Sequence, residues 1–261
     1  MRERRYGSPG VLPLSRVIAR TVVTIGHDGA MSSVELLDRP LYDETLAASV
    51  LNVPKSTLHW WLEGGIRAGR HYAPVLRQEP SGSKEVTWGE LVEARYLRAY
   101  RRDLGVKLGD LRRFIDELRQ NLGVPYPLAH AQPWVGAGRR LLVSAQNNVD
   151  LEPELWAVYE PRSGIALLTA PAESFLERVE FDQEGNGVVV RLRPAGYDSP
   201  VVIDPEIRFG SPAVTGIPTD TLDEMVRAGD SIESVADDYD LELDNVVAAL
   251  DYERARRQQV A

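Results

Sequence analysis

The 261-residue sequence predicts an α+β protein, and three observations lead to this prediction. Residues 39–130 combine helical apolar periodicity with a hairpin pattern, which is typical of a winged helix-turn-helix domain. Residues 131–200 contain short runs of strand-forming residues separated by Gly, Pro and Asn, so we expect a small β-rich module there. Residues 201–261 return to helical spacing and predict a helical C-terminal domain. Residues 1–38 lack such patterns, and we expect a disordered extension.

The composition is that of an ordinary soluble globular protein, with 43% hydrophobic and 26% charged residues. The absence of cysteine excludes a disulfide scaffold, Cys-ligated zinc and thiol catalysis, and it agrees with a reducing cytosol. No apolar run approaches the roughly 20 residues that span a bilayer, and the first residues do not form a signal peptide. We therefore expect a cytoplasmic protein. Met31 is an alternative first residue in the cell, because the patterned sequence begins only near Leu41.

The charge is unevenly distributed along the chain. Residues 55–119 carry 13 Lys and Arg against 9 Asp and Glu, whereas residues 120–261 carry 11 against 24. The overall charge of −9 argues against non-specific nucleic-acid binding by the whole molecule. A local DNA site in the basic half remains compatible with it, and the acidic half suggests a protein partner.

Residues 42–65, YDETLAASVLNVPKSTLHWWLEGG, predict two short helices joined by a tight turn. Asp43 is an N-cap for a first helix that extends to Leu51. Pro54 suits the first turn of the second helix, where its missing N–H has no helical partner. The second helix turns three apolar side chains toward the first: Leu58, Trp61 and Leu62.

A hairpin and two more helices are predicted next. HYAPVLRQ at 71–78 and KEVT at 84–87 are strand-like, and PSGS between them forms a turn. Thr87 to Glu90 form a capping-box pattern that begins a helix extending to about Arg102. Leu108-Gly109-Asp110 begins another helix, with an apolar stripe that continues to Leu122.

The second helix of the pair has the residue types that a DNA-reading helix needs. Small polar residues occupy its first turn, where base edges are reached, and cationic residues flank it for phosphate contacts. The candidate DNA-binding residues are Lys55, Ser56, Thr57, His59, Trp60, Arg70, His71, Arg77 and Lys84. We expect a homodimer, because two reading helices one DNA turn apart supply affinity that a single short helix lacks.

Residues 41–122 resemble the DNA-binding domain of the MerR family. The matching positions are Val53, Thr57, Leu58, Trp60, Trp61 and the segment GVKLGDLRRFID at 105–116. The resemblance implies two helices and a turn, a wing, and two further helices in this order. The chain departs from most MerR regulators because it continues into the β-rich module and an acidic tail, where those regulators have a dimerising coiled coil and a ligand pocket.

The middle module contains the runs LLVS, LWAVYE, GIALLT, FLERVEF and GVVVRLR, and DQEGNG at 182–187 is its best hairpin turn. Its aromatic residues have two interpretations. The ordinary one is the core of the module, and the other is the lining of a small-ligand pocket. The aromatic residues concerned are Trp134, Trp156, Tyr159 and Phe175.

Residues 203–253 resemble the domain-of-unknown-function family 433 that is found in VapB-type antitoxins. The matching features are Asp204-Pro205, Ile207, Gly210-Ser211-Pro212, the segment 216–219, Ala228-Gly229, the segment 231–239, Val246 and the segment 248–250. The resemblance implies a trihelical, helix-turn-helix-like unit. Here Thr215-Gly216-Ile217-Pro218 lacks an Arg that many members carry, so no role of that Arg is carried over. Residues 198–250 contain 13 acidic residues, and only Arg208 and Arg227 offset them, so this unit should contact protein rather than phosphates.

The order of these parts resembles DNA-binding antitoxins of type II toxin–antitoxin pairs. The resemblance implies two roles, which are neutralising a PIN-type ribonuclease toxin and repressing the shared operon as a dimer. The candidate toxin-binding residues are Arg254, Arg256 and Arg257, because guanidinium groups pair well with the carboxylates of a nuclease metal site. The alternative is that these cations only complement the dipole of the last helix.

We expect no enzyme activity, no metal and no cofactor. The four histidines, at 27, 59, 71 and 130, lack metal-ligand spacing, and no nucleophile elbow or phosphate-binding Gly loop is present. Two other functions remain open at this point. One is a MerR-like transcriptional regulator gated by a small ligand in the β-rich module, and the other is a protein scaffold whose front domain does not bind DNA.

Overall fold

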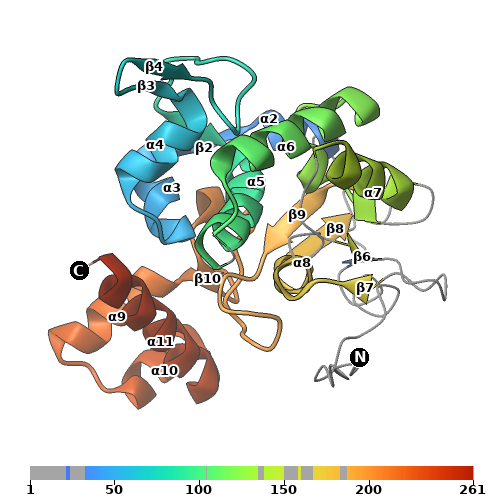
Figure 1. The fold of residues 1–261 in the computed structure, drawn as a ribbon. Helices are drawn as coiled ribbons and strands as arrows, with labels where there is room; N and C mark the ends of the chain where they lie inside the picture. Colours follow the sequence, from blue (N-terminus) through green and yellow to red (C-terminus); the bar gives the residue numbers. More distant parts are fainter. Residues whose placement is uncertain are drawn as a thin grey trace, which may run out of the picture.

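A capping box begins the helix around which the larger part of the fold is built. The Thr87 hydroxyl accepts a hydrogen bond from the Glu90 N–H, and the Glu90 carboxylate accepts one from the Thr87 N–H. These bonds satisfy two N–H groups that have no partner within the helix, and so fix the start of α5 (Trp88–Arg98). Nearly the whole of α5 is buried, and helices surround it (Figure 1).

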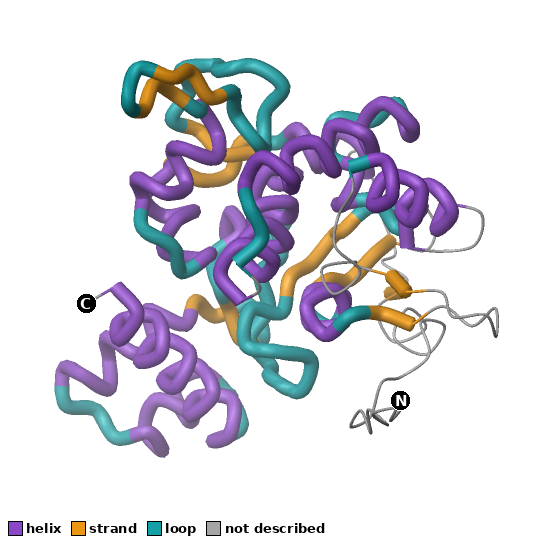
Figure 2. The backbone as a smooth tube through the Cα atoms, viewed as in Figure 1, coloured by secondary structure: helices purple, strands orange, loops and turns teal. Residues whose placement is uncertain are grey.

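The structure is a computed structural model that describes residues 22–23, 33–103, 105–134, 138–149, 158–159, 167–182 and 187–260. Its helices and five small sheets agree with the α+β class that the sequence predicts (Figure 2). None of the helices in these ranges is long and apolar enough to cross a bilayer.

The predicted pair of short helices is present as α3 (Glu44–Leu51) and α4 (Lys55–Glu63). The Asp43 carboxylate caps α3 by accepting hydrogen bonds from the N–H groups of Thr45 and Leu46. Asn52 ends α3 in the left-handed conformation, at φ 57°, and α4 starts directly after Pro54. The three apolar residues that were expected to face inward from α4 are buried: Leu58, Trp61 and Leu62.

The hairpin lies earlier in the chain than the sequence predicts. Strands β3 (Gly65–Arg67) and β4 (Arg70–Tyr72) pair around a two-residue turn, in which Ala68 and Gly69 both have positive φ. This is the geometry that matches the twist of a short hairpin. The predicted pairing of 71–78 with 84–87 is wrong, because β5 (Glu85–Thr87) pairs with β2 (Pro40–Asp43) instead. Gly64 permits the sharp entry into β3, since a Cβ there would collide with the Tyr72 carbonyl oxygen.

After α5 the chain makes one π-helical turn at Ala99–Asp103 and then forms α6 (Leu108–Leu122). The apolar stripe of α6 is buried as expected, and Gly123 ends the helix in the left-handed conformation. Short 3-10 turns follow at Pro127–Ala129 and Gln132–Trp134.

The middle of the chain contains more helix than predicted. LLVS lies within α7 (Gly138–Asn148) and the start of FLERVEF within α8 (Ala170–Leu176), although both were expected to form strands. The buried residues Leu142 and Ala145 of α7 and Val149 directly after it are three and four positions apart, which is the spacing of a helix face and not the alternation of a strand. The strands found here are β6 (Val158–Tyr159), β7 (Leu167–Leu168), β8 (Val179–Asp182) and β9 (Val189–Leu192).

The expected hairpin near 182–187 is present as the antiparallel pair β8 and β9, although residues 183–186 lie outside the described ranges. These strands share a core with the front of the chain. The Trp88 indole N–H donates a hydrogen bond of 2.7 Å to the Val189 carbonyl oxygen. Buried side chains from Leu36 to Ile203 pack together in one hydrophobic core.

Part of the segment expected to be a disordered extension is ordered. Helix α2 (Ser33–Asp38) packs on α5 and buries Leu36 and Leu37, which explains why this segment folds. The two-residue strand β1 (Val22–Val23) lies parallel to β8. Residues 1–21 and 24–32 lie outside the described ranges.

The C-terminal unit has its own core. A tight hairpin of β10 (Ala213–Val214) and β11 (Ile217–Pro218) precedes the three predicted helices, α9 (Thr219–Ala228), α10 (Ile232–Tyr239) and α11 (Leu243–Val260). The main apolar residues of this core are Val201, Val214, Leu222, Val235, Val246 and Ala249. The unit is the orange and red part of Figure 1, beside α3 and away from the β3–β4 hairpin.

Several hydrogen bonds join the units, among them the backbone bonds between Leu192 and Ile203 and the bond from Arg191 Nε to Asp204. The Tyr42 hydroxyl donates a 2.7 Å bond to the carbonyl oxygen of Gly210, and Arg256 Nε donates a 3.1 Å bond to Ser49 Oγ on α3. Gly210 has φ 74°, and a Cβ at this position would collide with the Tyr42 hydroxyl. The glycine therefore allows Tyr42 to lie against the C-terminal unit.

Candidate nucleic-acid interface

The first turn of α4 is exposed on the surface. Lys55 and Ser56 are exposed and Thr57 is half-buried. The backbone N–H of Thr57 donates to the Pro54 carbonyl oxygen at 2.9 Å, so the proline fixes the start of the helix. The Lys55 ammonium donates to Thr45 Oγ1 at 2.8 Å, which directs this charge toward the start of α3.

His59 and Lys84 lie on either side of a buried carboxylate. His59 Nδ1 is 2.8 Å from Glu44 Oε1, and Lys84 Nζ is 3.8 Å from the same oxygen. The Glu44 side chain is almost fully buried, whereas the lysine is exposed. Glu44 thus lies close to both predicted residues, and its negative charge reduces the positive potential that Lys84 presents to a phosphate.

The β3–β4 hairpin is the most exposed cationic element beside α4. Arg67, Arg70 and His71 are exposed, and Ile66 between them is 74% exposed. Trp60 of α4 packs against Tyr72 of the hairpin, with 5.7 Å between the two ring centroids. Arg67 was not among the predicted DNA-binding residues. A two-residue turn at Ala68-Gly69 is the signal that would have identified it, because this turn pairs Arg67 with Arg70.

A groove of about 480 Å³ follows the exposed side of α4. Its lining residues are Ser56, Thr57, Trp60, Trp61, Arg67, Arg101 and Leu108. Arg101 is held in place by its bonds to the carbonyl oxygens of Gly105 and Val106. The groove therefore brings together the polar first turn of α4, an arginine of the hairpin and an arginine that follows α5.

Arg77 does not belong to this exposed surface, and its placement among the DNA-binding residues is corrected. Its guanidinium forms ion pairs with Glu63 and with Glu90, the latter at 2.6 Å, and its side chain is only 9% exposed. It also donates to the carbonyl oxygens of Ser83 and Glu85. Burial by itself lowers the pKa of Arg77, but the hydrogen bonds and charges of the two carboxylates raise it above the usual value. Arg77 thus connects α4, the following loop and α5.

The three arginines of α11 all have acidic partners within the chain. Arg254 pairs with Asp251 at 2.9 Å on the exposed side of the helix. Arg256 pairs with Glu253 and contacts α3, and Arg257 binds both oxygens of Asp223. A partner carboxylate would have to replace these internal partners. Arg254 and Arg257 are exposed enough to permit that exchange, whereas Arg256 faces the junction.

A different exposed feature of the C-terminal unit was not predicted. Arg208 and Phe209 both have left-handed φ values, and the Phe209 side chain is 79% exposed. Ile207 beside it is also exposed. Consecutive non-glycine residues in this conformation are strained, and such strain is often found at binding sites. The sequence offered only Gly210 as a sign of an unusual backbone here.

The aromatic residues considered for a ligand pocket belong largely to the core. Trp134 and Phe175 are buried, and both pack against Tyr96 of α5 at centroid distances of 5.9 and 5.4 Å. Trp156 and the side chain of Tyr159 lie outside the described part of the chain. Within that part, no group of three or more His, Asp and Glu side chains could hold a metal ion.

The chain is similar to one family model, to two named proteins and to a solved structure. Residues 201–252 match the family model described as "Protein of unknown function (DUF433)". "Uncharacterized protein Rv2308" of Mycobacterium tuberculosis is 33% identical over 230 residues, which cover 87% of this chain and 95% of that protein. A second protein of the same organism, named "Putative antitoxin VapB45", is 30% identical over 82% of this chain and 94% of its own length. The crystal structure of Rv2018, also from M. tuberculosis, matches with a TM-score of 0.64 and 28% identity, over 82% of this chain and 99% of that chain.

Proposed function

Since the chain belongs to the family of the mycobacterial Rv2308 and "Putative antitoxin VapB45", we propose that it is the antitoxin of a type II toxin–antitoxin pair. The observation that carries this proposal is the alignment with the second relative. It spans 82% of this chain and 94% of that protein, so it includes the front half as well as the C-terminal unit. The toxin is proposed to be a PIN-type ribonuclease.

The front half is proposed to bind operator DNA as a MerR-like winged helix-turn-helix. In this proposal α3 and α4 are the helix pair, and the β3–β4 hairpin is the wing. The geometry supports it because the polar first turn of α4 and the exposed Arg67 of the hairpin border one groove. An α-helix of this kind fits the major groove, and arginines beside it suit the phosphate backbone. A homodimer would place two such helices on one operator.

The C-terminal unit is proposed to bind the toxin. Its acidic surface opposes a phosphate backbone but suits a basic protein partner. The exposed Phe209 offers a large apolar side chain at the surface, and aromatic residues are frequent among the side chains that dominate binding energy. Arg254 and Arg257 are the cations that could exchange their internal partners for carboxylates of the toxin.

Co-expression with the product of the neighbouring gene tests the proposal. We expect the neighbouring protein alone to arrest growth, and we expect the tagged chain to restore growth and form a stable complex with it. Phe209→Ser should weaken that complex. A matched change of the exposed Ile66 on the hairpin, Ile66→Ser, should leave the complex intact. A neighbouring protein that is neither toxic nor bound by the chain would contradict the antitoxin assignment.

Gel-shift measurements with the DNA upstream of the gene test the second role separately. Binding that weakens steeply with salt is expected, because phosphate contacts release counterions.

The alternative of a regulator gated by a ligand in the middle module is not favoured, since Trp134 and Phe175 fill the core.

A further inference from the structure

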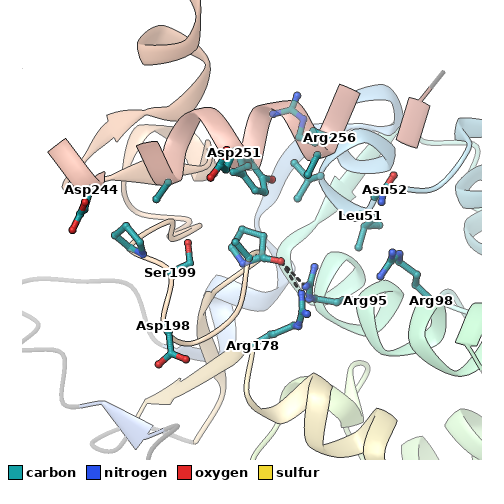
Figure 3. Close-up of a pocket in the computed structure, with 17 residues that line it drawn as sticks. Leu51, Asn52, Arg95, Arg98, Arg178, Asp198, Ser199, Asp244, Asp251 and Arg256 are labelled. Carbon is teal, nitrogen blue, oxygen red and sulfur yellow. Dashed lines mark hydrogen bonds between the residues drawn. The ribbon is translucent and has the colours of Figure 1, made fainter. Parts of the chain in front are cut away.

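A cavity of about 720 Å³ lies between the front part of the fold and α11 (Figure 3). One wall comes from the ends of α3 and α5, and the other comes from α11 and the loop at 194–200. Pockets for small molecules commonly measure about 300–1,000 Å³. Nothing in the DNA-binding or toxin-binding proposals uses this cavity.

Two guanidinium groups converge inside the cavity. Arg95 Nη2 and Arg178 Nη1 both donate to the carbonyl oxygen of Pro194, at 3.2 and 2.8 Å. Figure 3 shows these two side chains meeting at this oxygen, with Arg98 of the same helix beside them. Arg95 is only 8% exposed, and its Nε has no hydrogen-bond partner. In the described ranges, no carboxylate forms an ion pair with Arg95 or Arg178.

A buried guanidinium without a counter-charge is unfavourable, because desolvation opposes its charged form. Burial lowers the pKa of Arg95 to about 9, and the charges of Arg178 and Arg98 act in the same direction. The three carboxylates that line the cavity do not offset this, since all three are exposed: Asp198, Asp244 and Asp251. Asp251 is moreover paired with Arg254.

The opposite wall provides a further unused donor. The Tyr252 hydroxyl of α11 is buried, lines the same cavity and has no hydrogen-bond partner. Small and apolar side chains are also among the lining residues, and they include Val50, Ala248 and Ala255. The cavity therefore combines fixed cationic donors and a hydroxyl with some apolar lining, and this combination suits a small organic anion.

We propose that this cavity binds a small phosphate-bearing anion, which Arg95 and Arg178 hold through their guanidinium groups. A guanidinium group can donate two parallel hydrogen bonds to the oxygens of one phosphate. Two guanidinium groups together also match the double negative charge of a phosphate better than the single charge of a carboxylate. The Tyr252 hydroxyl donates to the same group from α11. The bound anion thus contacts both the front part and the C-terminal unit, so it stabilises the closed junction between them.

Thermal unfolding and calorimetric titration of the full chain test this proposal. Inorganic phosphate and pyrophosphate are the probes, at constant ionic strength adjusted with sodium chloride. We expect a saturable rise in melting temperature with either probe, since a ligand that binds only the folded state stabilises it. Sodium chloride at the same ionic strength should produce no such rise.

Three variants complete the experiment. Arg178→Gln, at a half-buried position, should weaken binding of the probe at least tenfold. Arg95→Met should abolish the saturable response while melting at or above the wild-type temperature without the probe, because it removes an unpaired buried charge. Arg113→Gln removes an exposed arginine of α6 that does not line the cavity, and it should bind like wild type. Equal responses in all four proteins, or a lower melting temperature of Arg95→Met together with retained binding, would overturn the proposal.

Discussion

Replacing Gly210 by alanine is expected to weaken the junction between the two units more than the strain of the substitution alone explains. Gly210 has φ 74°, and a left-handed residue other than glycine costs about 1–2 kcal/mol. The added Cβ would also collide with the Tyr42 hydroxyl. Tyr42 must then move, so its buried hydrogen bond to Gly210 is lost at a cost of about 1 kcal/mol. Overpacking of this kind adds about 1–3 kcal/mol.

Gly216 provides a matched control in the same unit. Its φ is 82°, and nothing lies within 4 Å of the Cβ that alanine would add. Gly216→Ala should therefore lower the free energy of unfolding by only the about 1–2 kcal/mol of backbone strain. The difference between the two variants, about 2–4 kcal/mol, isolates the contact with Tyr42.

Urea unfolding with two probes measures this difference. All five tryptophans, at 60, 61, 88, 134 and 156, precede the C-terminal unit, so their fluorescence reports on the front part. Far-UV circular dichroism reports on helices of both units. Gly210→Ala should separate the two transitions more than Gly216→Ala does. Equal losses of stability in the two variants would refute the reasoning, because they would mean that Tyr42 does not lie against Gly210.

Further predictions concern the proposed DNA surface and the buried charges. The double change Lys55→Glu and Arg70→Glu should abolish operator binding in gel shifts while the complex with the toxin remains, and DNA affinity retained at physiological salt would contradict the winged-helix proposal. Arg77→Met should lower the free energy of unfolding by about 3–5 kcal/mol in urea titrations, because two buried carboxylates lose their partner. A loss of unfolding free energy below about 1 kcal/mol would show that the ion pairs of Arg77 with Glu63 and Glu90 are solvated. Burial raises the pKa of Glu93 from 4.5 to about 7, despite the opposing charge of Arg119, so its contribution to stability is complete below pH 4.5 and is lost as the pH rises through 7. Glu93→Gln should remove this decline in the free energy of unfolding, which is at most about 3 kcal/mol. A variant with the same pH profile of unfolding as the wild type would contradict this prediction. Deleting residues 199–261 should release toxicity, whereas a truncated chain that still neutralises would place the toxin contact elsewhere.

Local signals in the sequence were sufficient for the helices that begin with a cap. Asp43 and the Thr87–Glu90 box identified the starts of α3 and α5 because capping involves residues only two or three positions apart. The strand-like run in α7 was misjudged because Leu-Leu-Val fits a strand as well as a helix. Only its burial pattern distinguishes the two structures.

The errors at the site come from contacts between distant residues. The two carboxylate partners of Arg77 lie 13 and 14 positions away, and no spacing rule identifies them. The cavity brings Arg95 close to Arg178 and to α11, and each of these lies more than 80 positions after Arg95 in the sequence. Sequence alone therefore indicated which half of the chain is basic, but it did not show which arginines are buried.

The two hydrophobic cores are separate clusters of buried side chains, and the units that contain them meet where α11 contacts α3. A junction of this kind opens without unfolding either core when its contacts cost less free energy to break than the cores do. Because α3 takes part in this junction through Ser49 and also packs against α4, open and closed forms would place the proposed DNA-binding helix differently. A molecule that binds one form more tightly shifts the balance by its difference in affinity for the two, and would so act on the proposed DNA-binding surface without touching it.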